Sequence, residues 1–120
     1  KLQVSAPFHT SMLKPAGDRL REDLNKIKFK KPDNKVISNV DTAYYETNEI
    51  IAEKLEKQVY NPVRWEACVR KMIADGVNTF VEIGPGKTLT GFIKKIDKNV
   101  KAINIENIQG LNSYLQFAGA

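Results

Sequence analysis

The segment from residue 79 to residue 105 constrains the fold of this chain more than any other part. Residues 79–83 (TFVEI) have the β-branched and aromatic composition of a strand, and Gly84-Pro85-Gly86 follows as a tight turn. A helix comes next, and a second strand covers residues 100–105. The helix places one apolar face inward, formed by Leu89, Phe92, Ile93 and Ile96. Strands that alternate with helices through short turns predict an α/β fold with a largely parallel sheet.

Apolar residues repeat at helical spacing in other parts of the chain as well. The first stripe has Pro15 in its first turn and consists of Leu13, Ala16, Leu20, Leu24 and Ile27. A second helix is predicted from about Thr47, its candidate N-cap, to about Gln58, with Ile50, Ile51 and Leu55 facing inward.

Two further helices are expected. Pro62 is assigned to the first position of a third helix, which ends at Asp75-Gly76 and has the stripe Trp65, Cys68, Val69, Met72 and Ile73. A short helix carrying Ile108, Leu111 and Leu115 closes the chain.

Strands are few in a chain of this length. Residues 36–40 (VISNV) are predicted as a short buried strand before a turn at Asp41-Thr42, and residues 2–4 as the end of another strand. About three strands fit in the 120 residues. So small a sheet, covered by helices, leaves an open edge that proteins normally pair or protect, which indicates further chain.

Composition narrows the class of protein. No apolar run approaches the roughly 20 residues of a membrane helix, and the N-terminus lacks the long apolar stretch of a signal peptide, so we expect a cytoplasmic protein without a membrane partner. The single cysteine, Cys68, excludes an internal disulfide and a multi-cysteine metal site. Its place on an apolar helical face favours a buried, inert thiol over a reactive one.

The net charge of +5 favours an acidic partner, such as nucleic acid, a CoA-type phosphate group or an acidic carrier protein. Basic residues are densest at Lys26, Lys28, Lys30, Lys31 and Lys35. A solvated helix end and loop is the favoured interpretation, because lysine near a helix C-terminus is favourable for dipole reasons alone. No aromatic ladder accompanies the lysines, so nucleic acid is not the expected partner.

His9 is the only histidine and a candidate general base. It lies in the loop Ser5-Ala6-Pro7-Phe8-His9-Thr10-Ser11, after a short apolar run and before a helix. The alternative is a loop histidine whose ring is satisfied by the local backbone. Neither serine of the loop is assigned as a nucleophile, and the Gly-x-Ser-x-Gly elbow is not present in the sequence.

Gly84-Pro85-Gly86-Lys87-Thr88 has part of a phosphate-loop pattern. The full pattern needs a glycine where Val81 stands inside the strand, so it fails. A structural turn is favoured over an anion site at the helix N-terminus. Glu82, at the end of the strand, is either a buried catalytic carboxylate or, as favoured, a carboxylate that accepts hydrogen bonds from the turn amides.

Four segments together carry a family resemblance: Val4–His9 (VSAPFH), Val36–Val40 (VISNV), Gln58–Trp65 (QVYNPVRW) and Phe80–Lys87 (FVEIGPGK). Their order and spacing resemble those of bacterial malonyl-CoA:acyl carrier protein transacylases over nearly the whole chain. The resemblance implies that residues 1–120 are the C-terminal segment of a large α/β-hydrolase-like domain, with residues 1–5 as the last strand leaving an inserted ferredoxin-like domain that is mostly or wholly absent.

The resemblance also implies a reaction. The family moves a malonyl group from CoA to the phosphopantetheine thiol of acyl carrier protein, through an acyl-serine intermediate, in fatty acid synthesis. It needs no metal or redox cofactor. His9 matches the catalytic histidine, the general base for serine and thiol, and Gln58 matches the residue whose main-chain carbonyl orients it. A neutral orienting group avoids repulsion with the malonyl carboxylate.

Two more residues take roles from the resemblance. Phe8 matches the position where phenylalanine favours malonyl and a smaller residue favours branched units. Ser38 and Asn39 match the strand end near the histidine; Asn39 is a candidate for supporting contacts, with a structural role favoured. The family's nucleophilic serine, its carboxylate-binding arginine and its oxyanion-hole glutamine loop have no counterpart in residues 1–120. We therefore expect the chain alone to be inactive and its partners to be malonyl-CoA, acyl carrier protein and the N-terminal part of the enzyme.

Two alternatives remain open. The chain can be the matching segment of a polyketide synthase-type acyltransferase, which shares the Asn61-Pro62-Val63-Arg64-Trp65 motif. From another class, it can be a noncatalytic module that binds anions or carrier protein through the glycine turn and the lysines.

Overall fold

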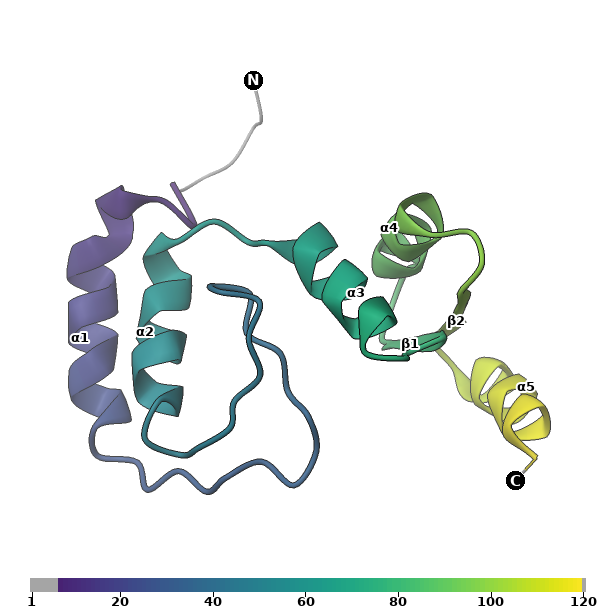
Figure 1. Cartoon of the computed structure of the whole chain (residues 1–120), viewed down its shortest axis with the longest axis horizontal. Helices are drawn as coiled ribbons and strands as arrows, with labels where there is room; N and C mark the ends of the chain where they lie inside the picture. The colour runs from purple at the N-terminus through teal and green to yellow at the C-terminus, as the bar shows by residue number, and fades with distance from the viewer. Residues whose placement is uncertain (1–6, 120) are drawn as a thin grey trace. The chain divides into compact units, whose positions relative to one another are not determined.

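The computed structural model describes residues 7–119, shown in Figure 1. The strand predicted for residues 2–4, and residues 1–5 as a strand leaving an inserted domain, lie outside the described residues. The chain divides into two compact units, the first up to Cys68 and the second from Val69. Within the part described, no helix has both the length and the apolar character that a membrane span requires.

The first unit is built on two neighbouring helices, α1 (Lys14–Leu24) and α2 (Ile51–Tyr60), with a 3-10 turn, η1 (Ser11–Leu13), ahead of α1. Arg21 of α1 contacts Glu56 of α2. Gly17, one turn before Arg21 in α1, lies against Tyr60, one turn after Glu56 in α2. The two helices therefore run antiparallel, as the side-by-side ribbons in Figure 1 show.

The first helix is confirmed, with Pro15 in its first turn, but only part of its predicted apolar stripe is buried. Gly17 and Leu24 are buried, whereas Ala16 and Leu20 are exposed. Ile27 lies beyond the helix end and is also exposed. The packed face includes Gly17, the one position of α1 without a side chain, which lies against the ring of Tyr60 on α2.

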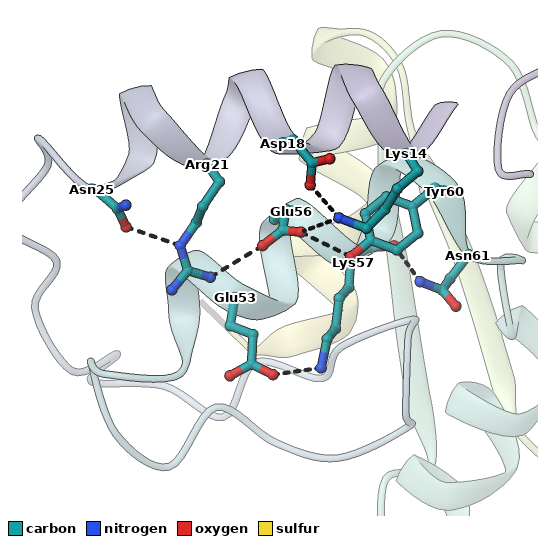
Figure 2. Close-up of polar contacts among 9 residues, drawn as sticks. All are labelled: Lys14, Asp18, Arg21, Asn25, Glu53, Glu56, Lys57, Tyr60 and Asn61. Atoms are coloured by element: carbon teal, nitrogen blue, oxygen red, sulfur yellow. Dashed lines mark hydrogen bonds and ion pairs between the residues drawn. The ribbon is translucent and has the colours of Figure 1, made fainter. Parts of the chain in front are cut away.

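A charged cluster joins α1 to α2 (Figure 2). The carboxylate of Glu56 lies 3.3 Å from Nη1 of Arg21 and 3.6 Å from Nζ of Lys14. It also accepts a 2.8 Å hydrogen bond from the hydroxyl of Tyr60. Burial and then this bond raise the pKa of Tyr60. The side chain of Glu56 is only 13% exposed, so its three partners stabilise a carboxylate that has little access to water.

Helix α2 begins and ends later than the sequence predicts. Ile50 is the N-cap in place of Thr47, and the last helical residue is Tyr60 instead of Gln58. Ile51 is buried, while Ile50 and Leu55 are half-buried. Pro62 does not begin the next helix either, because α3 starts at Trp65 and runs to Ala74. The proline instead holds Asn61 extended, since the residue before a proline avoids the helical conformation.

Residues 36–40 do not form the predicted strand. They make one antiparallel bridge, between Ile37 and Tyr44, closed by backbone bonds from Ser38 N to Ala43 O and from Tyr45 N to Val36 O. The predicted turn at Asp41-Thr42 lies between the two arms. Ser38 is buried and Val36 is 45% exposed, so the apolar residues of this segment do not form a buried strand.

The second unit contains β1 (Thr79–Ile83), α4 (Thr88–Ile96), β2 (Lys101–Ile105) and α5 (Ile108–Ala118). The strands pair in parallel from Thr79 with Lys101 to Ile83 with Ile105. Helix α4 packs on both strands and α5 on β2. The α/β class and the strand–helix–strand segment are confirmed, but the sheet within residues 7–119 has two strands instead of about three.

The apolar faces of this unit are more exposed than predicted. In α4 the buried residues are Thr90 and Ile93, while Leu89 and Phe92 are 38% and 46% exposed. In α5 no residue is buried, and Ile108 is 68% exposed. A sheet of two strands is too narrow to cover these faces. In α3, Cys68 and Val69 of the predicted stripe are fully buried.

Candidate active site

His9 stands in a tight turn ahead of η1. Its φ angle is 59°, in the left-handed region that residues other than glycine seldom adopt. The hydroxyl of Thr10 donates a 2.8 Å bond to Pro7 O, and Leu13 N donates a 3.0 Å bond to Thr10 O. These bonds on either side hold the turn, and the imidazole is exposed.

The ring of His9 is bonded to a main-chain carbonyl 49 positions later: its Nδ1 atom lies 2.9 Å from the oxygen of Gln58. A carbonyl oxygen carries no proton, so Nδ1–H must be the donor. The neutral ring is then unprotonated at Nε2, which is free to accept a proton.

Gln58 is itself fixed by its side chain. Its Nε2 atom donates a 3.3 Å hydrogen bond to the hydroxyl of Tyr45. Tyr45 is 9% exposed, and its amide donates to Val36 O at 2.9 Å. The two-armed segment at residues 36–45 thus anchors the last turn of α2, which presents its carbonyl to the imidazole.

Three of the predicted site residues line one small pocket: His9, Asn39 and Gln58. Its other walls are Val40, Asn61, Pro62 and Val63. Phe8 does not line this pocket and is 64% exposed. The sequence motifs that hold these residues are far apart in the chain, so it is the packing of residues 36–45 and 58–63 around the turn at His9 that brings them together.

Asn39 lies at the edge of a buried polar contact. Its Oδ1 atom and the carbonyl of Ser38 each lie 3.6 Å from Sγ of Cys68. Ser38 is buried and its hydroxyl accepts a 3.3 Å bond from Val40 N. Burial raises the pKa of the Cys68 thiol. These contacts fit the prediction of an inert buried thiol.

Glu82 caps a helix in the second unit. Its carboxylate accepts hydrogen bonds from the Thr90 hydroxyl at 2.6 Å, from Thr90 N at 2.8 Å and from Leu89 N at 3.1 Å. The Thr90 contacts above all hold the pKa of Glu82 below its usual range. The favoured interpretation, a carboxylate bonded to main-chain amides, is confirmed, but these amides belong to the first turn of α4 and not to the glycine turn.

The glycine turn is a braced structural turn. Gly84 and Gly86 have φ angles of 140° and 85°, which only glycine adopts without strain. The Nδ2 atom of Asn104 donates a 2.7 Å bond to Gly86 O, and Glu106 accepts a 3.1 Å bond from Gly86 N. The amide that an anion would use is therefore already bonded to a carboxylate.

The lysine cluster lies on the surface. Lys28, Lys30 and Lys31 are exposed on the segment after α1, and Lys26 pairs with Asp23 at 2.7 Å. Lys35 lies 5.6 Å from the ring centre of Tyr44. The favoured interpretation, a solvated helix end and loop, agrees with this placement.

Sequence reasoning missed Tyr45, Asn61 and Pro62 as parts of the site. Tyr45 carries no local signal, since its contact with Gln58 depends on tertiary packing. Pro62 does carry a local signal. It stands four residues after Gln58, the position whose N–H would bond the Gln58 carbonyl if the helix continued.

No protein-family model matches the chain. The malonyl CoA-acyl carrier protein transacylase of Bacillus subtilis is 43% identical over 115 residues, which are 96% of this chain and 36% of that protein. The transacylase of Haemophilus influenzae is 37% identical, over 97% of this chain and 37% of its own length. The chain thus spans a little over a third of the curated relatives it matches.

Solved structures give the same family. A malonyl CoA-acyl carrier protein transacylase from Clostridium perfringens has a TM-score of 0.93 and 48% identity, over 99% of this chain and 38% of that one. A malonyl-transacylase in complex with a type II polyketide synthase acyl-carrier protein has a TM-score of 0.93 and 38% identity, over 97% of this chain and 38% of that one. Sequence and fold therefore match this chain to a C-terminal segment of the malonyl CoA-acyl carrier protein transacylases.

Proposed function

We propose that this chain supplies the general base of a malonyl-CoA:acyl carrier protein transacylase. The observation that carries the proposal is the 2.9 Å contact between His9 Nδ1 and Gln58 O. It leaves Nε2 as the proton acceptor of a ring already held in one orientation, which is what a base needs before its substrate arrives.

In the first half-reaction, Nε2 of His9 takes the proton of a serine hydroxyl supplied by the rest of the enzyme. The serine oxygen attacks the thioester carbonyl of malonyl-CoA, the carbon–sulfur bond breaks, and the imidazolium returns the proton to the CoA sulfur. In the second, Nε2 takes the proton of the carrier thiol. The sulfur attacks the malonyl ester, and the serine oxygen leaves and regains its proton.

The neutral carbonyl suits this reaction better than a carboxylate. An aspartate beside the ring would stabilise the imidazolium, but it would also repel the carboxylate of the malonyl group. A carbonyl fixes the same tautomer with a dipole and no net charge. Phe8, exposed beside His9, is the residue proposed to favour malonyl over bulkier acyl groups through its size.

A serine nucleophile and oxyanion donors account for most of the rate in acyl transfer, and the proposal takes them from the rest of the protein. The chain alone is therefore expected to be inactive. The test is a chimera in which residues 1–120 replace the matched segment of the Clostridium perfringens transacylase. Transfer of malonyl from CoA to carrier protein supports the proposal; a well-folded chimera without transfer contradicts it.

The carrier protein that the chimera prefers distinguishes the fatty acid pathway from the polyketide pathway. A relative has been solved with a type II polyketide synthase carrier, so the chimera is assayed with that carrier class and with a fatty acid carrier. We propose the fatty acid carrier as the natural acceptor. A kcat/KM that is higher for the polyketide carrier would favour the alternative.

We propose that the exposed lysines help to dock the acidic carrier. Changing Lys28, Lys30 and Lys31 to glutamate should raise the KM for carrier protein and leave the KM for malonyl-CoA unchanged. The matched control reverses Lys94, Lys95 and Lys98 of the second unit, which are also exposed. Equal effects of the two triple variants would mean that only net charge matters.

A further inference from the structure

The carbonyl that receives His9 is open because of a proline. Gln58 lies in the last turn of α2, where a continuing helix would bond its carbonyl to the N–H four residues on. That residue is Pro62, which has no N–H. The helix therefore has no donor of its own for Gln58 O, and the bond that this oxygen accepts comes from His9 Nδ1.

The neighbouring carbonyl is already occupied. Asn61 donates twice to Lys57 O, from its backbone N at 3.1 Å and from its side-chain Nδ2 at 2.8 Å, the latter drawn in Figure 2. Asn61 has φ −110° and ψ 150°, the extended conformation that a following proline imposes. Of these two adjacent carbonyls in the last turn, Lys57 O is satisfied locally and Gln58 O is left for the imidazole.

We propose that Pro62 is a positioning residue for His9: by withholding an N–H from Gln58 O, it keeps that carbonyl available and so sets the imidazole tautomer with Nε2 as the base. Pro62, His9 and Gln58 line the same small pocket. The inference rests on the proposed role of His9, but it concerns the imidazole itself and not the transfer reaction.

The test uses the single histidine of the chain, which gives one imidazole signal pair in a ¹⁵N NMR spectrum of histidine-labelled protein. In the unchanged chain with a neutral ring, Nδ1 should carry the proton and Nε2 should not. Pro62→Ala restores an N–H that competes for Gln58 O. The ratio of Nδ1–H to Nε2–H tautomer should then fall about three- to tenfold, the equivalent of one ordinary hydrogen bond.

Pro85→Ala is the matched control, since it adds an N–H in the turn after β1 and leaves position 62, four residues after Gln58, unchanged. It should leave the tautomer ratio unchanged. A Pro62→Ala chain with the same ratio as the unchanged chain would overturn the proposal, as would an unchanged chain whose neutral ring is protonated at Nε2.

A second variant separates the missing N–H from the packing of the proline ring. In a semisynthetic chain, residue 62 is the α-hydroxy analogue of alanine, which has an ester oxygen in place of N–H. It should keep the Nδ1–H tautomer, because it offers Gln58 O no donor. Loss of that tautomer in the ester chain would show that the ring matters and overturn the proposal, and this result stands even if Pro62→Ala does not fold.

The outcome is separable from that of the proposed function. The tautomer measurement needs neither serine nor substrate. The expected tautomers in the chain would support the role of Pro62. If the chimera then transfers no malonyl group, the role of His9 in transfer is contradicted while that of Pro62 stands.

Discussion

Gly17 on α1 lies directly against the ring of Tyr60 on α2. A Cβ atom on Gly17 would lie 2.7 Å from both Cδ1 and Cε1 of the Tyr60 ring. The ring has little freedom to withdraw, because its hydroxyl is bonded to Glu56 and Nζ of Lys14 lies 5.0 Å from its centre. The glycine is therefore a packing requirement of this helix pair.

Gly17→Ala should destabilise the first unit. Alanine favours a helix, but the added methyl must displace the Tyr60 ring, at a cost of about 1–3 kcal/mol that outweighs the gain in propensity. The matched control is Gly91→Ala in α4, where nothing lies within 4 Å of the added atom, and it should stabilise by about 0.5–1 kcal/mol. Denaturant unfolding followed by circular dichroism measures both, and a Gly17→Ala chain as stable as the original would contradict this packing.

Glu56→Gln should destabilise the helix pair more than the same change at Glu53. Glu56 is largely buried among Lys14, Arg21 and Tyr60. Losing its charge removes the anion that pairs with Arg21 and one of the two that pair with Lys14, at a cost of about 1–2 kcal/mol. Glu53 on the same helix pairs with Lys57 at the surface, where an ion pair contributes little. Unfolding midpoints compare the two variants, and equal effects would argue against the cluster in Figure 2.

Glu82 should make the second unit sensitive to acid. Its folded pKa lies below the ordinary 4.5, so its contribution to stability is present above that ordinary value and is lost as the pH falls through the lowered pKa. Glu82→Gln should lower the melting temperature at neutral pH, and the difference from the original chain should vanish in acid. Glu22→Gln, at an exposed site of α1, serves as the control. A difference that persists unchanged at low pH would count against the cap.

Cys68 should resist alkylation in the folded chain. It is 2% exposed, and burial raises its pKa, which lowers the fraction of reactive thiolate. Iodoacetamide at neutral pH, followed by mass spectrometry, should label the thiol slowly in buffer and rapidly in denaturant. Equal rates would mean that Cys68 is accessible.

The segments whose structure was predictable are those whose local signals and packing agree. Residues 79–105 combine strand composition, a glycine turn and a helical stripe, and the strands, the turn and the helix all form, although Leu89 and Phe92 of the stripe are exposed. Gly17 shows why the packed face of α1 was only partly predictable: a glycine carries no hydrophobic signal, whereas Ala16 and Leu20 carry one and are exposed. Residues 36–40 were predicted as a strand but form a single bridge. Their pairing depends on Tyr44, which lies outside the segment from Val36 to Val40.

For the site, the resemblance gave His9 and Gln58, and the structure brings them within hydrogen-bond distance. Their roles, and those of Phe8 and Asn39, stay predictions, as do the absence of a cofactor and the cytoplasmic location. Tyr45 was not predictable, because its contact with Gln58 exists only after residues 36–45 fold against α2. The role of Pro62 follows from a four-residue spacing that is visible in the sequence but has meaning only once Gln58 is known to lie in a helix.

The most direct measurement of the central claim is the effect of His9→Ala on malonyl transfer by the chimera with the Clostridium perfringens enzyme. Removing a general base should lower kcat by about 10²- to 10⁴-fold and change the KM for malonyl-CoA little. Lys98→Ala, at an exposed position of the second unit, should leave both unchanged. A His9→Ala chimera that transfers malonyl at the rate of the unchanged chimera would show that His9 is not the base.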